Sequence, residues 1–373
     1  MNQALNDQTV EDGTPSPLQS MIADSVERLF AEQVTPQILA HFDAGRAATQ
    51  LWQQVVDLGL PGALMPETAG GSAASWLDIS PVLRAIGYWS APLALSETML
   101  ASLLLAHGGL HVPEGPITLI QIGHYGDLRL TEDRVLDGRA FNVPWARSCR
   151  WAAVADGNGH VALVDLRQAA VSVETGSNFA GEERDTLYFD NASVHAVGSL
   201  KVADVQEPVW LFGALMRACM LVGALESSLD KAVNYANERA QFGKAIGKFQ
   251  AIQQQLAQMA GAIGAARMAT QVALRSACEA LHAEQGSRNS LAFDVAVAKV
   301  CAGEAATLAT SVTHQVHGAI GFTHEHTLHF TTRRLWSWRD EFGSDAQWAE
   351  VLGQAAIAAG GDGFWAGLTQ RRF

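Results

Sequence analysis

The sequence predicts a chain of three parts: an α-helical region over residues 1–115, a small β-barrel or β-sandwich over 116–205, and a four-helix bundle over 206–373. Three observations indicate this order. Apolar residues recur at helical spacing in the first part, short apolar runs separated by glycine and aspartate fill the second, and long alanine-rich helical patterns fill the third. A chain of 373 residues can bury a large core spread over more than one domain.

The first region has the pattern of successive helices. Apolar residues recur at spacings of three and four between residues 21 and 60, and Pro36 interrupts them. Helical patterns resume over residues 74–107. Residues 1–20 are polar and acidic and lack a basic start followed by an apolar core, so we expect a leader and not a signal peptide.

The middle region has the pattern of a small antiparallel sheet. Its short apolar runs begin at Ile117, Trp151, His160, Ala170 and Thr186. The Gly157-Asn-Gly159 stretch joins two of these runs as a hairpin turn would, so it does not open a strand-helix-strand unit of the dinucleotide-binding kind. We therefore expect no Rossmann domain.

Composition excludes several classes of protein. The net charge of -13 disfavours nucleic acid, whose phosphates require a basic footprint. The longest apolar stretches are interrupted by Glu97, Arg217 and Glu226, so we expect no membrane span. The four cysteines are far apart and form no Cys-x-x-Cys pair, which is typical of free thiols in a reducing cytoplasm.

The most informative stretch runs from Arg239 to Gln250, where two glycines interrupt the chain before a new helix begins near Phe249. Arg239 offers a fixed charge suited to a phosphate or pyrophosphate. Phe242 and Phe249 offer flat apolar surfaces suited to a ring system, and Gln250 lies off the buried stripe of its helix. By residue type alone, a bend with core phenylalanines and a solvated arginine is the commoner interpretation.

The order Arg-x-x-Phe-Gly, a second glycine and then Phe-Gln at the start of a long helix resembles the signature of the acyl-CoA dehydrogenase family. Helical, β, helical is also the order of that family's fold, so the resemblance covers nearly the whole chain. In the family, this arginine and the first phenylalanine contact the diphosphate and adenine of an FAD held by the neighbouring subunit. The resemblance implies these roles for Arg239 and Phe242, with Phe249 and Gln250 beside the same cofactor.

A second motif, from His314 to Glu325, resembles the family's Gln-x-x-Gly-x-x-Gly-Phe turn. In the family, its glutamine and glycine backbone support the FAD adenosine of the other subunit, and the matching positions are Gln315 and Gly318. A cofactor shared in this way implies at least a dimer, and the family commonly forms tetramers. Homomeric and heteromeric assemblies both stay open.

The middle domain departs from the family pattern. The Thr-Glu-Pro-Gly-Ala-Gly-Ser loop that members commonly carry beside the flavin is missing, and Val143-Pro-Trp-Ala146 occupies the place of their Trp-Ile-Thr strand. Trp145 is the candidate to pack on the flavin, and an ordinary core tryptophan is the alternative. A trimmed β domain resembles divergent members that act on bulky substrates such as steroid side chains, often as two-subunit complexes.

The resemblance implies α,β-dehydrogenation of an acyl-CoA thioester, with a carboxylate as the base and electrons passed to an electron-transfer flavoprotein. In the common branch the base is a glutamate directly before Gly-Thr. Here Gly343-Ser344 matches that pair, which places Ser344 near the flavin, but Phe342 precedes it. Glu341, one residue earlier, is the expected base, Asp340 is the second choice, and a solvated helix end is the structural alternative.

Some relatives place the base on an earlier helix, about ten residues before the glycine that matches Gly223. That position is Gly213 here, and no carboxylate lies near it in the sequence. The shifted glutamate and the missing loop therefore favour a second hypothesis. In it, the chain is a non-catalytic or half-site subunit that keeps part of the FAD surface and depends on a partner chain for its base.

Five histidines between His314 and His329 suggest a metal site, because imidazoles three residues apart on a helix can share one ion. No carboxylate or cysteine has the spacing to complete such a site. We therefore expect no metal, and we interpret this stretch as part of the cofactor-facing turn.

Overall fold

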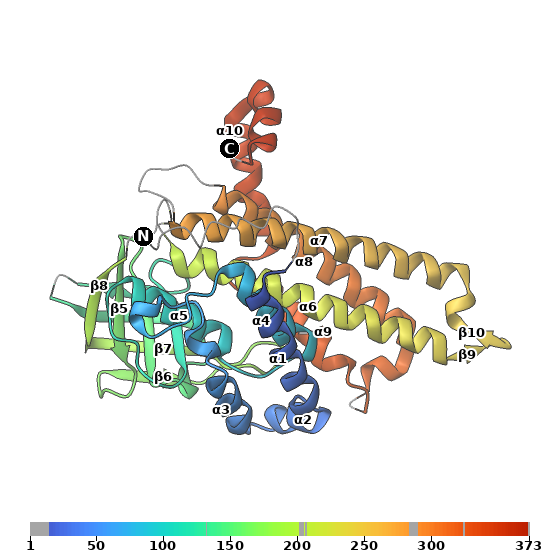
Figure 1. The fold of residues 1–373 in the computed structure, drawn as a ribbon, viewed down its shortest axis with the longest axis horizontal. Coiled ribbons are helices and arrows are strands. Elements are labelled where there is room, and N and C mark those ends of the chain that lie inside the picture. Colours follow the sequence, from blue (N-terminus) through green and yellow to red (C-terminus); the bar gives the residue numbers. More distant parts are fainter. Residues whose placement is uncertain are drawn as a thin grey trace.

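A computed structural model of the chain describes residues 15–371 except 132, 201–204, 206, 283–289 and 324. Figure 1 shows a β-rich part at one end and long helices that extend away from it to a small hairpin at the other end. The last helix projects from the body. The predicted order of helical, β and helical regions is confirmed.

The N-terminal region is helical: α1 (Pro17–Gln33), α2 (Pro36–Asp43), α3 (Thr49–Asp57), α4 (Trp76–Trp89) and α5 (Leu95–His107), with the short 3-10 helices η1 (Leu60–Gly62) and η2 (Glu67–Ala69). Sequence determines where these helices begin. Ser16 and Thr35 cap α1 and α2, each followed by a proline whose missing N–H costs nothing at a helix start. Ser75 and Asp78 form a reciprocal capping box on α4.

Two four-stranded sheets form the middle region. One has the order β1 (Ile117–Gln121), β4 (Trp151–Ala155), β5 (His160–Asp165), β8 (Ala196–Ser199), and the other β2 (Arg129–Leu130), β3 (Val135–Pro144), β7 (Arg184–Ser193), β6 (Val171–Glu174). Residues such as Leu136, Val154 and Leu187 form a core of their own here. The predicted purely antiparallel arrangement is wrong in one pair, because β1 and β4 are parallel. Strands β2 and β3, which lie between them in sequence, pair in the other sheet.

The C-terminal region consists of long helices: α6 (Pro208–Glu238), α7 (Gln250–His282), α8 (Leu291–His317), α9 (Leu328–Asp340) and α10 (Asp345–Thr369). The hairpin β9 (Ala240–Gln241) and β10 (Lys244–Ala245) with η4 (Ile246–Lys248) joins α6 to α7, and η5 (Gly318–Phe322) follows α8. By length and composition α6 could cross a membrane, but 94% of its most apolar window is buried inside the protein. It is the central helix of the core.

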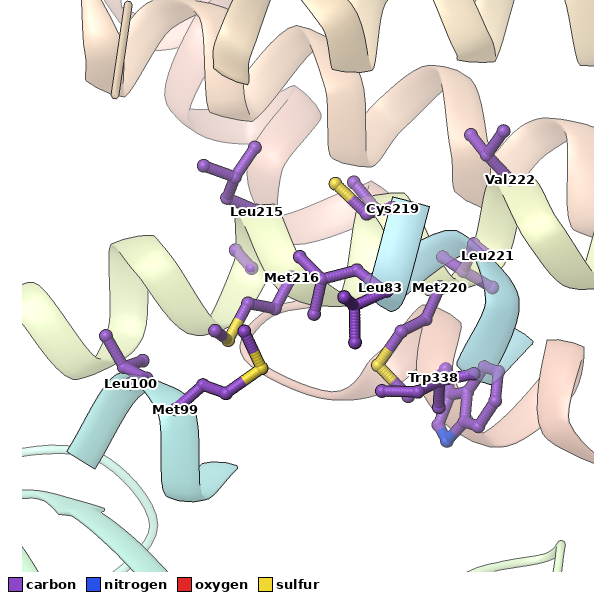
Figure 2. Close-up of a cluster of buried hydrophobic side chains, with 14 of the residues drawn as sticks. Leu83, Met99, Leu100, Leu215, Met216, Cys219, Met220, Leu221, Val222 and Trp338 are labelled. Atoms are coloured by element: carbon purple, nitrogen blue, oxygen red, sulfur yellow. The ribbon is translucent and has the colours of Figure 1, made fainter. Parts of the chain in front are cut away.

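Helices α4 and α6 cross in direct backbone contact. A Cβ on Gly87 would overlap the carbonyl oxygen of Met220, and one on Gly223 would overlap that of Arg84. Only glycine permits this approach. Around the crossing, Figure 2 shows Leu83 of α4, Met99 of α5, several α6 side chains and Trp338 of α9 meeting in one apolar cluster. The N-terminal helices and the C-terminal bundle therefore share a single core.

Candidate functional site

A cavity of about 370 Å³ lies between the β region and the C-terminal bundle. Its walls are the end of β1 with the following turn, the end of β3, the turn before β7, the start of α6 and the end of α9. The side chains that line it include His124, Tyr125, Phe141, Phe179, Trp210, Trp336 and Phe342. Flat aromatic walls of this kind suit a planar ring system or a bulky apolar group.

The β wall of the cavity is irregular. The pairing of β3 with β7 shifts register between Ala140 and Val143, and Asn142 lies there at φ 55°. Such bulges are frequent beside active sites, because they release backbone from the sheet and redirect side chains. The backbone N–H of Phe141 donates to the carbonyl of Tyr125 at 2.6 Å, which joins the bulge to the turn after β1.

Aromatic contacts hold the helical wall. The His124 ring stacks on Trp210 with centroids 3.8 Å apart, and its Nε2 lies 3.0 Å from an oxygen of Glu207. Trp210 also meets the Phe342 ring edge to face at 6.4 Å. Burial raises the pKa of the Tyr125 phenol, whose oxygen lies 3.5 Å from the carbonyl oxygen of Asp340.

Glu341 lies at the cavity, and both of its carboxylate oxygens are held by arginine. Arg184 donates to them at 2.7 to 2.8 Å, Arg217 donates at 2.6 Å, and Asn178 adds a hydrogen bond of 2.9 Å. Burial alone would raise the pKa of this carboxyl, but the charges of Arg184 and Arg217 outweigh it and hold that pKa at about 2. As arranged here, Glu341 is a weak proton acceptor.

The two arginines extend into a buried ladder of alternating charge. Arg217 also pairs with Glu97 of α5, and Arg184 lies 3.3 Å from Glu182, which in turn lies 3.0 Å from Arg334 of α9. All five side chains are at most 5% exposed. The ladder joins the N-terminal region, the β region and the C-terminal bundle behind the cavity.

Sequence reasoning did not assign these arginines to the site. In the sequence, Arg217 and Glu97 are conspicuous only because each interrupts an apolar run. That interruption is the one sequence feature from which their pairing could have been predicted. A charge in the middle of a buried helix requires a partner, because an unpaired buried ion is very costly. An arginine and a glutamate that interrupt two separate core helices are therefore candidates to pair with each other.

Asp340 differs from Glu341 in its surroundings. It lines the cavity, and its side chain is 70% exposed. Partial desolvation raises the pKa of its carboxyl, although the neighbouring Arg339 acts in the opposite direction. Among the cavity-lining residues that the structure describes, Asp340 and Glu341 are the acidic ones. Of the two, Asp340 has the freer carboxylate.

Phe342 and Gly213 are in contact. A Cβ on Gly213 would lie 2.5 Å from Cδ1 of the Phe342 ring, so the ring covers this stretch of α6 where glycine leaves room. These positions match the two places where the resemblance locates a base, one before Gly-Ser and one on the earlier helix. The structure brings the two positions together and fills both without a carboxylate.

The residues predicted to contact the cofactor lie elsewhere. The β9–β10 hairpin lies at the opposite end of the molecule from the β region (Figure 1). Arg239 and Phe242 follow the end of α6 at this hairpin, whereas the start of α6 lines the cavity. The 31 residues of α6 separate them by roughly 45 Å. Phe242 is 92% exposed and Arg239 and Gln250 are exposed, with Phe249 edge to face on Phe242 at 6.2 Å.

This separation tests whether the residues fit FAD. A ring as exposed as that of Phe242 needs covering by another molecule. The hairpin and the cavity of one chain are too far apart to hold one dinucleotide, so a cofactor that uses both has to lie between two chains. Gln315 and Gly318, at the end of α8, are also exposed, and a side chain at Gly318 would meet open space. The residues fit a shared FAD.

Two other residues predicted to contact the cofactor, Trp145 and Ser344, make packing and capping contacts within the chain. Trp145 is 6% exposed and packs with Ala94, Cys149 and Phe42, while its neighbours Val143 and Pro144 line the cavity. Ser344 caps α10, where its hydroxyl accepts from the N–H of Gln347 at 3.2 Å. The structure thus gives each of them a packing or capping role, and contact with the flavin stays a prediction.

The histidines stack with aromatic neighbours. His314 stacks on Phe322 and His317 on Tyr235, and burial lowers the pKa of both imidazoles. His324 lies outside the described residues. Within the described part of the chain, no group of three or more His, Cys, Asp or Glu side chains could hold a metal ion.

Comparison with known proteins identifies the class. The family profile "Acyl-CoA dehydrogenase, C-terminal domain" matches residues 210–356, and "Acyl-CoA dehydrogenase, N-terminal domain" matches residues 16–110. Together they cover well over half of the chain. The chain belongs to the acyl-CoA dehydrogenase family, whose members are FAD-dependent oxidoreductases that act on acyl-CoA thioesters.

One curated relative and two solved structures of the same fold illustrate the similarity. The acyl-CoA dehydrogenase IpdE2 of Mycobacterium tuberculosis is 26% identical over 328 residues, covering 86% of this chain and 92% of that protein. The ChsE4-ChsE5 complex of the same organism has a TM-score of 0.78 at 22% identity and coverages of 92% and 98%. The steroid ACAD Tcur3481-Tcur3483 has a TM-score of 0.79 at 23% identity with the same coverages.

Proposed function

We propose that this chain takes part in FAD-dependent α,β-dehydrogenation of an acyl-CoA thioester, with electrons passed on to an electron-transfer flavoprotein. The observation that carries the proposal is the aromatic cavity between the β region and the C-terminal bundle, with the acidic turn of Asp340 and Glu341 at its edge. The exposed hairpin of Arg239 and Phe242 supports a cofactor shared with a second chain. A cytoplasmic location is proposed on the four free cysteines.

The reaction needs two acceptors on opposite sides of the substrate. FAD, when bound, supplies the acceptor for the hydride that leaves the β carbon. A carboxylate has to take the proton from the α carbon and become a carboxylic acid, and hydrogen-bond donors have to stabilise the thioester oxygen as it gains charge. Because Glu341 is held by two arginines, Asp340 is the better proton acceptor within this chain.

A second candidate function is favoured by a specific observation. Phe342 and Gly213 fill both places where a base is expected, and Glu341 is fully engaged. This arrangement supports a half-site subunit whose partner is a different chain of the same fold that carries the base. The similarity to the ChsE4-ChsE5 complex, which has two kinds of chain, supports the same proposal.

The acyl group is proposed from the shape of the cavity. Several rings line it, and the Thr-Glu-Pro-Gly-Ala-Gly-Ser loop that family members commonly carry is missing from the sequence. Both observations favour a bulky acyl chain such as a steroid side chain over a short straight one. The similarity to a steroid ACAD points in the same direction. A branched or ring-bearing acyl-CoA is thus the first substrate class to test.

Anaerobic mixing of the purified chain with straight-chain, branched and steroid-type acyl-CoAs, followed at the flavin absorbance maximum, tests both candidates. Bleaching by the chain alone would show bound FAD and a working base. Asp340→Asn should then abolish it, and if Glu341→Gln abolishes it instead, Glu341 is the base. A yellow chain that never bleaches, or a colourless one, favours the half-site subunit.

The half-site candidate has a test of its own. Phe342→Glu places a carboxylate before Gly343, next to the space over Gly213, and Phe342→Leu is the matched control without a charge. If the chain lacks only a base, the glutamate variant should bleach with an acyl-CoA when FAD is bound, and the leucine variant should not. Equal behaviour of the two variants contradicts the candidate.

A further inference from the structure

The turn Asp340–Gly343 at the cavity is held from behind by one lysine. Lys299 of α8 is fully buried, and its Nζ donates to the carbonyl oxygens of Trp338 at 3.3 Å, Arg339 at 3.0 Å and Glu341 at 2.9 Å. Carbonyls at the end of a helix have no donor inside that helix. An ammonium group has three N–H donors, which matches the three acceptors.

We propose that Lys299 is a positioning residue for the reaction, which fixes the turn Asp340–Gly343 so that its side chains face the cavity. It acts through the backbone of the turn, since Lys299 itself does not line the cavity. The inference rests on the proposed function in taking this cavity as the substrate site. The sequence has only five lysines, and one of them is placed under this turn.

Other contacts complete the support of the turn. Nε1 of Trp348 donates to the carbonyl of Phe342 at 3.0 Å, and Arg339 holds both oxygens of Asp345 at 2.9 Å. Gly343 is at φ 91°, where a side chain would lie 2.5 Å from Trp348 Nε1. Removing the lysine amine alone therefore leaves the turn attached at its C-terminal side and takes this donor from the carbonyls of Trp338, Arg339 and Glu341.

The charges around Lys299 come from three elements. Glu341 and Asp340 at the end of α9 and Asp345 at the start of α10 attract its charge, while Arg217 of α6 repels it. Burial lowers the pKa of Lys299 to about 7, against the attraction of Glu341. A deprotonated amine has two donors for three carbonyls, so we expect the turn to loosen as the pH rises through this value.

Hydrogen exchange measured by mass spectrometry tests the proposal on the chain alone. Lys299→Met keeps an apolar side chain of similar length and removes the donors. The matched control is Lys231→Met, because Lys231 is partly buried and donates to Thr331 Oγ1, away from the turn. We expect peptides over residues 338–344 to exchange about tenfold faster or more in Lys299→Met, and within about twofold of wild type in the control.

Equal exchange of these peptides in wild type and Lys299→Met, or an equal effect of the Lys231 control, overturns the proposal. If Lys299→Met does not fold, a pH series on the wild type replaces it. Exchange of the turn, corrected for its intrinsic rate, should rise between about pH 6 and 9 with the titration of Lys299 followed by lysine-selective NMR. A flat series contradicts the proposal.

The assembled enzyme provides a third readout. Lys299→Met should lower kcat far more than it raises KM, because it displaces the reacting groups without removing binding surface. This measurement needs a working dehydrogenase, and the exchange measurement does not. If the proposed function is wrong, the exchange of residues 338–344 should still differ between Lys299→Met and wild type. If the positioning role is wrong, the exchange should be the same in both, whether or not the chain is a dehydrogenase.

Discussion

The surroundings of the two ends of α6 differ in whether their side chains have partners within the chain. At its start, around the cavity, charges are paired, rings are stacked and the turn after α9 is anchored by Lys299 and Trp348. At its far end, Arg239 and the Phe242 ring are open to solvent. The charged and aromatic groups around the cavity have partners within the chain, whereas the exposed hairpin is suited to contact with a second molecule. Stability and cofactor binding should therefore respond to different residues.

The largest expected effect comes from breaking the ladder. Arg217→Met leaves Glu97 and Glu341 without their shared cation, and removing one partner of a buried pair costs about 3–5 kcal/mol of unfolding free energy. Arg84→Met is the control, because that arginine is 47% exposed in its pair with Glu226 and should cost about 1 kcal/mol or less. Urea denaturation measures both, and similar losses would show that the ladder is no stronger than a surface pair.

Acid should act on the same end of the molecule. The pKa of Glu341 is about 2 in the folded chain, below the ordinary value of 4.5, so its contribution to stability is complete above pH 4.5 and is lost as the pH falls towards 2. Glu341→Gln removes this part of the dependence. Between pH 5 and pH 3, the midpoint temperature of thermal unfolding should fall less steeply in the variant than in wild type. Parallel curves would contradict the assignment.

A smaller effect is expected where Phe342 covers α6. Gly213→Ala adds a methyl group 2.5 Å from the ring, and overpacking of this kind costs about 1–3 kcal/mol. In a Phe342→Ala background the same substitution should be nearly neutral, since the space is empty. A double-mutant cycle by urea denaturation measures the coupling, and additive losses would show that the ring moves aside freely.

The smallest effect on stability is expected at the hairpin. Phe242→Ser removes an exposed ring and should change the unfolding free energy of the apo chain by about 0.5 kcal/mol or less. FAD retention by the assembled protein should nevertheless weaken roughly tenfold or more, because base stacking on an aromatic ring is lost. Equilibrium dialysis against FAD measures this, and unchanged retention removes Phe242 from the cofactor surface.

Local sequence patterns predicted the order of the regions and the position of the turn between α6 and α7, which the structure shows to be a hairpin. Helical spacing and caps are encoded over a few residues, as at Ser16 and Ser75. The parallel pairing of β1 with β4 and the ladder were not predictable in this way. Glu341 meets Arg217 and Arg184 across 124 and 157 residues of sequence, and no periodic pattern records such partners. Its place beside the cavity followed from a motif, whereas its charge state depended on the fold.

The glycine crossing of α4 and α6 determines which wall of the cavity can move. With carbonyls packed against Gly87 and Gly223, no layer of side chains separates the helices, so they lack the interdigitated surface on which packed helices slide. Trp210, at the start of α6, is thereby fixed to the N-terminal region. The turn after β1 rests on Trp210 through the His124 ring, and within this turn Gly123 and Gly126 have positive φ angles of 94° and 143°. We expect substrates to gain access by displacement of that turn.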